Sequence, residues 1–148
     1  MKVRMHHQHA NPEALQAMLA LEKFIQQSSL DHKLYELIKL RASQINGCSF
    51  CIDMHSKDLL KIGETPERLL LLPVWREVPS FSEQERAVLE LTEYATKLSE
   101  AGVPQEVYER VQKHFDEKQL VDILMAINII NSWNRLSITT GMFPGCLD

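Results

Sequence analysis

The chain has 148 residues, of which 45% are hydrophobic and 24% charged, and its formal net charge at pH 7 is −4. This composition is typical of a folded globular protein, and the length suits one domain, which we expect to span residues 1–148. The net charge of −4 offers no electrostatic footprint for nucleic acid, which needs a basic face, so we expect no nucleic-acid partner. No segment is apolar enough to span a bilayer, and the N-terminus lacks the apolar core of a signal peptide, so we expect a cytoplasmic protein without membrane association.

Helix-start and helix-stop signals recur along the first half of the chain. A capping side chain, a proline at the first helical position, and a glycine or asparagine after the last apolar residue are typical of helix ends. These signals predict helices that begin at Asn11-Pro12, after Asp31 and at about Cys48, the last of them ending at Ile62, and a short segment from Thr65 to Leu72. Asn46-Gly47 separates the second helix from the third.

The second half of the chain has the same signals. Ser82 and Glu85 form a capping-box pattern, and Asp116 with Gln119 forms another. We expect the first of these helices to run to Gly102, and a further one to begin at Pro104. The last helix, which ends before Gly141, is apolar on most sides and is therefore expected to be central or at a subunit interface. Because no segment alternates like a strand, the sequence predicts an all-α bundle of six to seven helices.

Two of the three cysteines are too close in sequence to link distant parts of the chain. In a reducing compartment such a pair reads as catalytic or metal-binding. Cys48, Cys51 and His55 share one face at the N-terminal end of the third predicted helix. The helix dipole favours a thiolate near Cys48, and His55 can exchange a proton with Cys51. A CxxC pair at this position also closes into a disulfide with little movement.

Other interpretations of the cysteines stay open. Buried cysteines often act as small hydrophobic side chains. Zinc is a second possibility, because CxxCxxxH supplies three ligands, but a closed structural site needs four. The candidates for a fourth ligand are Cys146, His114 and the N-terminal histidines His6, His7 and His9. A thioredoxin fold is disfavoured because no strand precedes the cysteines.

Glu36 lies twelve residues before Cys48, on the preceding predicted helix. If the two helices pack alongside each other, its carboxylate can approach His55 and orient the imidazole; otherwise it is an ordinary surface acid. Arg41 falls within an apolar stripe and is expected to be paired and partly buried. We expect Cys146 to be a bystander and the N-terminal histidines to belong to a mobile polar segment. Periodicity does not place Trp133.

The spacing of these residues resembles that of the AhpD-like alkylhydroperoxidase branch of the carboxymuconolactone decarboxylase family. The similarity rests on Glu36, eleven intervening residues, the run Cys48-Ser49-Phe50-Cys51, and His55 three residues later. It extends to the segment from Phe81 to Leu89 and to Asn131-Ser132-Trp133-Asn134-Arg135, and so covers residues 30–143.

The resemblance implies an all-α fold assembled as a homo-oligomer, typically a trimer or hexamer. It implies reduction of a hydroperoxide by a CxxC that cycles between dithiol and disulfide, with no bound cofactor. An external dithiol, such as a lipoyl group or a protein, would be the reductant. Cys51 resembles the peroxide-attacking cysteine and Cys48 the resolving one, while His55 and Glu36 resemble the proton-relay pair. The base beside Cys51 should also outweigh the screened dipole at Cys48, worth about 0.3–1 kcal/mol.

The chain departs from the family pattern at one position. Peroxidase members carry a histidine immediately before the second cysteine, where this chain has Phe50. The decarboxylase members lack the CxxC, so lactone decarboxylation is disfavoured. Two other classes of function are left as alternatives: a redox- or zinc-sensing protein without turnover, and a lyase or isomerase that uses Glu36 and His55 as acid and base.

Overall fold

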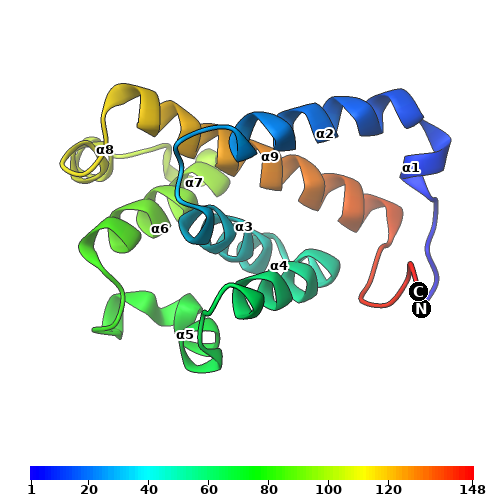
Figure 1. Ribbon diagram of the computed structural model, residues 1–148, viewed down its shortest axis with the longest axis horizontal. Coiled ribbons are helices and arrows are strands. Elements are labelled where there is room, and N and C mark those ends of the chain that lie inside the picture. The colour runs from blue at the N-terminus through cyan, green and yellow to red at the C-terminus, as the bar shows by residue number, and fades with distance from the viewer.

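The computed structural model covers residues 1–148 and contains helices but no strands (Figure 1). The elements are α1 (His7–Ala10), α2 (Pro12–Gln26), α3 (His32–Asn46), α4 (Ser49–Lys61), α5 (Pro66–Leu71), the 3-10 helix η1 (Leu72–Glu77), α6 (Glu83–Thr96), α7 (Leu98–Ala101), α8 (Gln105–Gln112) and α9 (Glu117–Thr140). The all-α prediction is confirmed. The structure has more helices than the six to seven expected, because it includes single-turn helices that carry no apolar periodicity.

The predicted caps form as the sequence indicates. The side chains of Asn11 and Asp31 accept hydrogen bonds from backbone amides at the starts of α2 and α3. Ser82 and Asp116 each complete a capping box at the starts of α6 and α9. Since these bonds satisfy amides that the helix itself leaves free, they fix where each helix begins.

Two predicted boundaries are wrong. The helix expected to continue to Gly102 breaks at Lys97, whose φ and ψ are −98° and 39°. Leu98, beyond the break, is 59% exposed, so burial of this side chain does not favour continuation of the helix. Cys48 is the N-cap of α4 rather than part of its first turn, and its sulfur accepts a hydrogen bond from the amide of Cys51 at 3.4 Å.

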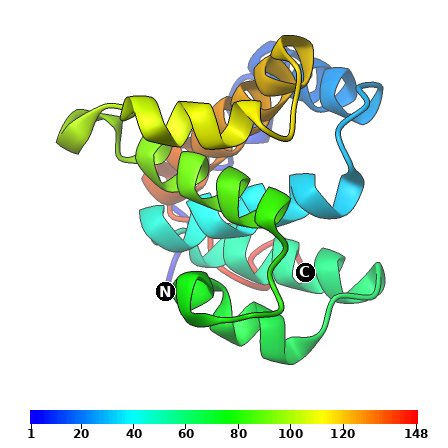
Figure 2. The same ribbon diagram turned by 90° about the vertical axis from the view of Figure 1, so that its left-hand side faces the viewer.

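The helices stack in three tiers, and α3 lies in the middle one (Figures 1 and 2). Helices α2, α8 and α9 form one outer tier, α3 and α6 the middle, and α4 and α5 the other outer tier. Helix α3 packs against α4, α6 and α9. One apolar cluster of 16 buried residues fills the space on the α9 side of α3, and a second cluster of seven lies on the α4 side. Burial on both sides therefore holds α3 rigidly.

A polar network of exposed Asn46 and buried Ser43, Asn131 and Asn134 ties the end of α3 to α9, just before the cysteines. The amide of Asn46 donates to the side-chain oxygens of Asn131 and Asn134, both at 2.9 Å. Asn134 in turn donates to the hydroxyl of Ser43 at 3.0 Å. Gly47 then adopts a left-handed conformation, with φ of 72°, which glycine reaches without strain. This network and turn fix the direction in which the chain enters α4.

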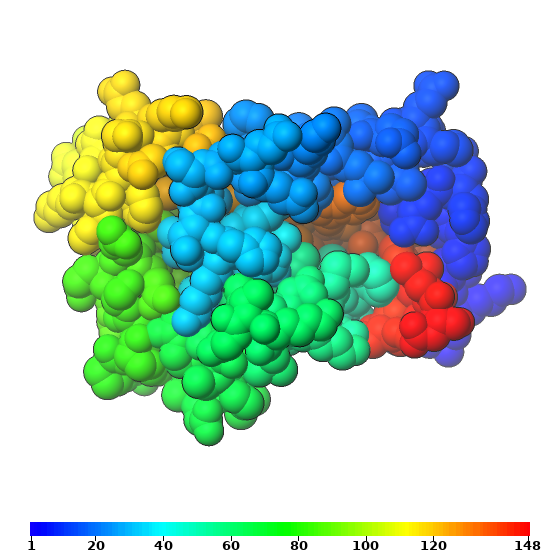
Figure 3. Space-filling model, in the orientation of Figure 1, coloured from blue at the N-terminus to red at the C-terminus, as the bar shows by residue number.

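The two ends of the chain pack together, contrary to the expected mobile N-terminus. The amide of Arg4 donates to the carbonyl of Thr140 at 2.8 Å, and Nε2 of His7 lies 3.2 Å from the sulfur of Met142. Gly141 permits the close approach: its φ is +77°, and a Cβ there would lie 3.2 Å from Cγ of Arg4. The N-terminal and C-terminal segments are in contact on the surface in Figure 3. Hydrogen bonding along the backbone, invisible to hydropathy, explains the difference.

No helix in the structure has both the length and the apolar character needed to cross a membrane.

Replacing Asn134 with alanine should destabilise the protein, because it removes a hydrogen-bond partner from buried Ser43 and from Asn46 and opens a small cavity in the buried side of the network. We expect the free energy of unfolding to fall by about 2–3 kcal/mol in urea denaturation. The exposed neighbour Arg135 provides the matched control, and Arg135→Ala should change stability little. Equal effects of the two substitutions would show that the network does not stabilise the fold.

Candidate active site

Helices α3 and α4 bring Glu36 and His55 into contact. The two residues are 19 positions apart, and Nδ1 of His55 lies 3.0 Å from Oε2 of Glu36. Both side chains are buried, with 4% and 9% of their surface exposed. The tight turn at Gly47 allows α4 to return along α3, so that one side chain from each helix meets in the interface between them. Glu36 is therefore not a surface acid.

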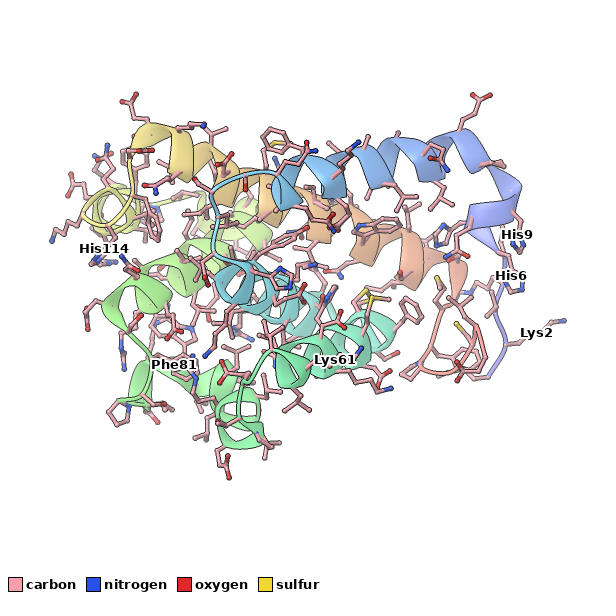
Figure 4. All side chains as sticks on the ribbon, viewed as in Figure 1. Lys2, His6, His9, Lys61, Phe81 and His114 are labelled. Carbon is pink, nitrogen blue, oxygen red and sulfur yellow. A yellow bond between two sulfur atoms is a disulfide. The ribbon has the colours of Figure 1, made fainter.

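The two cysteines form a disulfide at the start of α4, visible as a sulfur–sulfur bond in Figure 4. Their Cα atoms are 5.3 Å apart. Both are buried, but they differ in what they face: Cys51 lines a pocket together with His55, whereas Cys48 does not contribute to the pocket wall. The pair is therefore asymmetric, and a molecule in the pocket can reach Cys51 first.

The pocket has a volume of about 390 Å³ and lies between α2, α4, α9 and the packed chain ends. Half of its 16 lining residues are hydrophobic. The apolar part of the wall includes Leu15, Leu19, Phe50, Met54, Trp133 and Met142. Phe50, the departure from the family pattern, thus adds apolar surface to the pocket where a histidine would add a polar group.

Lys39 is a third member of this site that the sequence analysis did not identify. Its Nζ lies 2.7 Å from Oε1 of Glu36, so the two carboxylate oxygens contact Lys39 and His55 respectively. The Lys39 side chain is only 8% exposed, yet the residue lines the pocket. The signal was present in the sequence, because Lys39 follows Glu36 at the helical spacing i,i+3.

A second carboxylate, Glu22, holds the neighbouring wall of the pocket. It accepts a hydrogen bond from the hydroxyl of Tyr35 at 2.6 Å and another from Nε1 of Trp133 at 3.0 Å. Burial, followed by the contact with Glu22, raises the pKa of Tyr35, so its hydroxyl stays a neutral donor. These bonds join α2, α3 and α9 and place Trp133, which periodicity had left undecided, in the pocket wall.

The surroundings of Glu36 keep it ionised. Burial raises the pKa of Glu36, but the hydrogen bond from His55 and the charge of Lys39 more than offset burial, and the net pKa is lowered. An ionised Glu36 can only accept, so Nδ1 of His55 carries the proton and Nε2 is the basic nitrogen. Nε2 of His55 can therefore accept a proton.

Glu36, His55 and Asp58 form a group whose ligand atoms lie within 4.8 Å of one another and could hold a metal ion. However, Glu36 already contacts the Lys39 ammonium, and a second buried cation beside it would be repelled. Among the histidines considered as a fourth zinc ligand, His7 lines the same pocket as Cys51 and His55. His6 and His9 lie at one end of the molecule, beside the chain ends, and His114 lies at the opposite end (Figure 4).

Arg41 and Cys146 lie outside the pocket wall. Arg41 is partly buried and its Nε lies 3.0 Å from Glu93, which confirms that it is a paired arginine. Cys146 is a free, partly exposed cysteine in the C-terminal turns, and its role as a bystander stays a prediction.

The sequence model of the carboxymuconolactone decarboxylase family matches residues 12–94, more than half of the chain. The chain therefore belongs to this family, and its fold is the AhpD-like one that the sequence indicated. It is 47% identical over 141 residues to the uncharacterized protein YdfG of Bacillus subtilis, with 95% of this chain and 96% of YdfG covered.

Two solved structures of proteins with different described functions share the fold. A protein of unknown function from Agrobacterium tumefaciens, proposed to be the antioxidant defence protein AhpD, matches with a TM-score of 0.93 and 43% identity, covering 97% of this chain and 99% of its own. The debrominase Bmp8, in complex with 2,3,4-tribromopyrrole, matches with a TM-score of 0.82 and 19% identity, covering 93% of this chain and 74% of its own. The second likeness extends to the fold alone.

The lowered pKa of Glu36 predicts a pH-dependent contribution to stability. Because the pKa of Glu36 is lower in the folded state than its ordinary value of 4.5, ionised Glu36 stabilises the folded state at pH values above 4.5. This stabilisation is lost as the pH falls through the folded-state pKa. At pH 7 we expect Glu36→Gln to lower the free energy of unfolding by about 3 kcal/mol, since Lys39 and His55 lose their buried partner.

Urea denaturation of the oxidised protein between pH 7 and pH 3 checks this prediction. The difference between the wild type and Glu36→Gln should narrow as the pH drops below 4.5. The exposed Glu67 serves as the control, and Glu67→Gln should give a small difference at every pH. A gap between wild type and Glu36→Gln that stays constant with pH would contradict the account of Glu36.

Proposed function

We propose that this protein is a thiol-dependent peroxidase that reduces hydroperoxides through a dithiol/disulfide cycle of Cys48 and Cys51. The observation that carries the proposal is the arrangement of the pocket. Cys51 and His55 both line the pocket, and Glu36 contacts Nδ1 of the His55 imidazole. Cys48, which is not part of the pocket wall, is bonded to Cys51. This arrangement supports Cys51 as the nucleophile, His55 as its base and Cys48 as the resolving thiol.

The cycle starts from the reduced dithiol. Nε2 of His55 takes the proton of the Cys51 thiol, and the thiolate attacks the terminal oxygen of the hydroperoxide. The O–O bond breaks, Cys51 becomes a sulfenic acid, and the departing alkoxide receives the proton from His55 to leave as an alcohol. The Cys48 thiol then attacks the Cys51 sulfur, which forms the disulfide and releases water. An external dithiol reduces that disulfide and is itself oxidised to a disulfide.

The pocket favours an organic hydroperoxide over hydrogen peroxide. Half of its lining residues are hydrophobic, and they surround a volume that exceeds what a small polar peroxide needs. Each methylene group that a substrate buries there contributes about 0.8 kcal/mol of binding. The electron donor in the proposal is a dithiol, such as a lipoyl group or a protein thiol pair, and no bound cofactor takes part.

The proposed assembly is a homo-oligomer, a trimer or hexamer, in the cytoplasm. Several large apolar side chains lie uncovered on the surface, among them Leu70, which is 80% exposed, and Val121 and Leu124 on α9. Val121 and Leu124 are three residues apart and share one face of α9, and adjacent exposed apolar side chains of this kind support burial of that face by another subunit. They also agree with the expectation that α9 lies centrally or at an interface.

Two other functions have one supporting observation each. The debrominase Bmp8 shares the fold, so this fold also supports a reaction other than peroxide reduction; in this chain a lyase or isomerase would use Glu36 and His55 as acid and base. The grouping of Glu36, His55 and Asp58 is the observation on the side of a metal- or redox-sensing protein without turnover, and the Lys39 ammonium beside Glu36 opposes a metal ion there. Activity that survives replacement of both Cys48 and Cys51 would indicate the first, and stoichiometric zinc without peroxide consumption the second.

Substitution of single cysteines tests the proposal. Cys51→Ser should abolish peroxide consumption, because it removes the nucleophile. Cys48→Ser should react once, leaving a sulfenic acid on Cys51 that a dimedone-type reagent traps, but should lose dithiol-dependent turnover. Cys146→Ser is the matched control and should retain wild-type turnover, since this cysteine is free and lies outside the pocket wall. Unchanged turnover in Cys51→Ser would refute the proposed peroxidase.

A further inference from the structure

Lys39 presents a buried ammonium group to the pocket that contains Cys51 and His55. Its Nζ lies 2.7 Å from Oε1 of Glu36 and 3.9 Å from the centre of the Tyr35 ring. A buried lysine with one carboxylate partner and an aromatic face beneath it is held in a fixed position. Tyr35 is itself fixed, because its hydroxyl donates to Glu22.

The ammonium has one donor more than these contacts use. It carries three N–H groups, of which one points to Glu36 and a second faces the Tyr35 ring. Since Lys39 also belongs to the pocket wall, the third N–H is available to a molecule in the pocket. In a partly apolar pocket, a fixed donor of this kind interacts more strongly with negative charge than it would in bulk water.

The proposed reaction creates negative charge at one defined atom. When the Cys51 thiolate attacks the terminal oxygen of a hydroperoxide, the O–O electron pair moves to the departing oxygen, which becomes an alkoxide before it is protonated. Phe50 lines the pocket beside Cys51 but offers no donor to that oxygen. His55 supplies the proton that it took from Cys51, but it does not supply a permanent positive charge.

We propose that Lys39 is a catalytic residue that donates a hydrogen bond to the departing oxygen of an organic hydroperoxide. The inference rests on the proposed peroxidase function. The proton balance of the reaction is unchanged: the thiol proton passes through His55 to the alkoxide, and Lys39 stays protonated throughout. Glu36 then has two roles, since it orients His55 with one oxygen and holds Lys39 with the other.

The test measures how the rate of Cys51 oxidation depends on the leaving alcohol. Reduced protein is mixed with a series of alkyl and aryl-alkyl hydroperoxides whose alcohols differ in pKa, and disulfide formation is followed in single turnovers. Lys39→Met should lower the second-order rate by about 100- to 1,000-fold, the usual effect of losing one such donor. The loss should be largest for the most basic leaving alcohols, so that the slope against alcohol pKa becomes steeper.

Two variants separate this role from a structural one. Lys39→Arg retains a cation and should keep the wild-type slope with a smaller loss of rate. Lys33→Met removes a partly exposed lysine from the same helix and should change neither slope nor rate. Urea denaturation of each variant shows whether it is folded under the assay conditions.

The outcomes are distinct. A uniform loss of rate in Lys39→Met, with an unchanged slope, would assign Lys39 a structural role and overturn the inference while leaving the peroxidase intact. An unchanged rate would overturn it as well. If the wild type fails to oxidise with any hydroperoxide of the series, the proposed function fails, and the inference falls with it.

Discussion

The hydrogen bond between Glu36 and His55 is the interaction on which the rest of the site depends, because it crosses the interface between α3 and α4. Two helices can hold such a bond only if their relative position is fixed to within a fraction of an ångström. The turn at Gly47 sets their direction, and the network around Asn46 and Asn134 fastens that turn to α9. Apolar packing on both sides of α3 supplies the rigidity.

The charges around Glu36 explain how a carboxylate can be buried there at all. An isolated buried carboxylate would be strongly destabilising, but Lys39 and His55 each satisfy one of its oxygens. Glu36 and Lys39 balance each other's charge without a proton on both nitrogens of His55, and the neutral imidazole is the form in which His55 can act as a base. The same contacts that make burial tolerable therefore prepare the imidazole for proton transfer, so stability and proposed chemistry share one set of bonds.

The sequence indicates much of the fold and part of the site, for reasons that are local. Caps such as Ser82 and Asp116 and the glycine at position 47 act through neighbouring backbone groups, so their spacing alone locates the helices. The CxxC and His55 lie on one helix face and are likewise visible in the spacing. The sequence does not indicate the role of Lys39, because a buried lysine resembles a surface lysine in sequence. It also does not indicate the backbone hydrogen bond between Arg4 and Thr140, because a contact between chain ends follows no periodicity.

The central claim is that a hydroperoxide oxidises Cys51 and that Cys48 resolves the product. Mass spectrometry of the reduced protein after one equivalent of cumene hydroperoxide tests it most directly, because one tryptic peptide, residues 42–57, contains both cysteines. We expect the protein to lose two hydrogen atoms, the loss to map to this peptide, and a dithiol to reverse it. Oxygen added at Met142 or Cys146, with an unchanged peptide 42–57, would contradict the account.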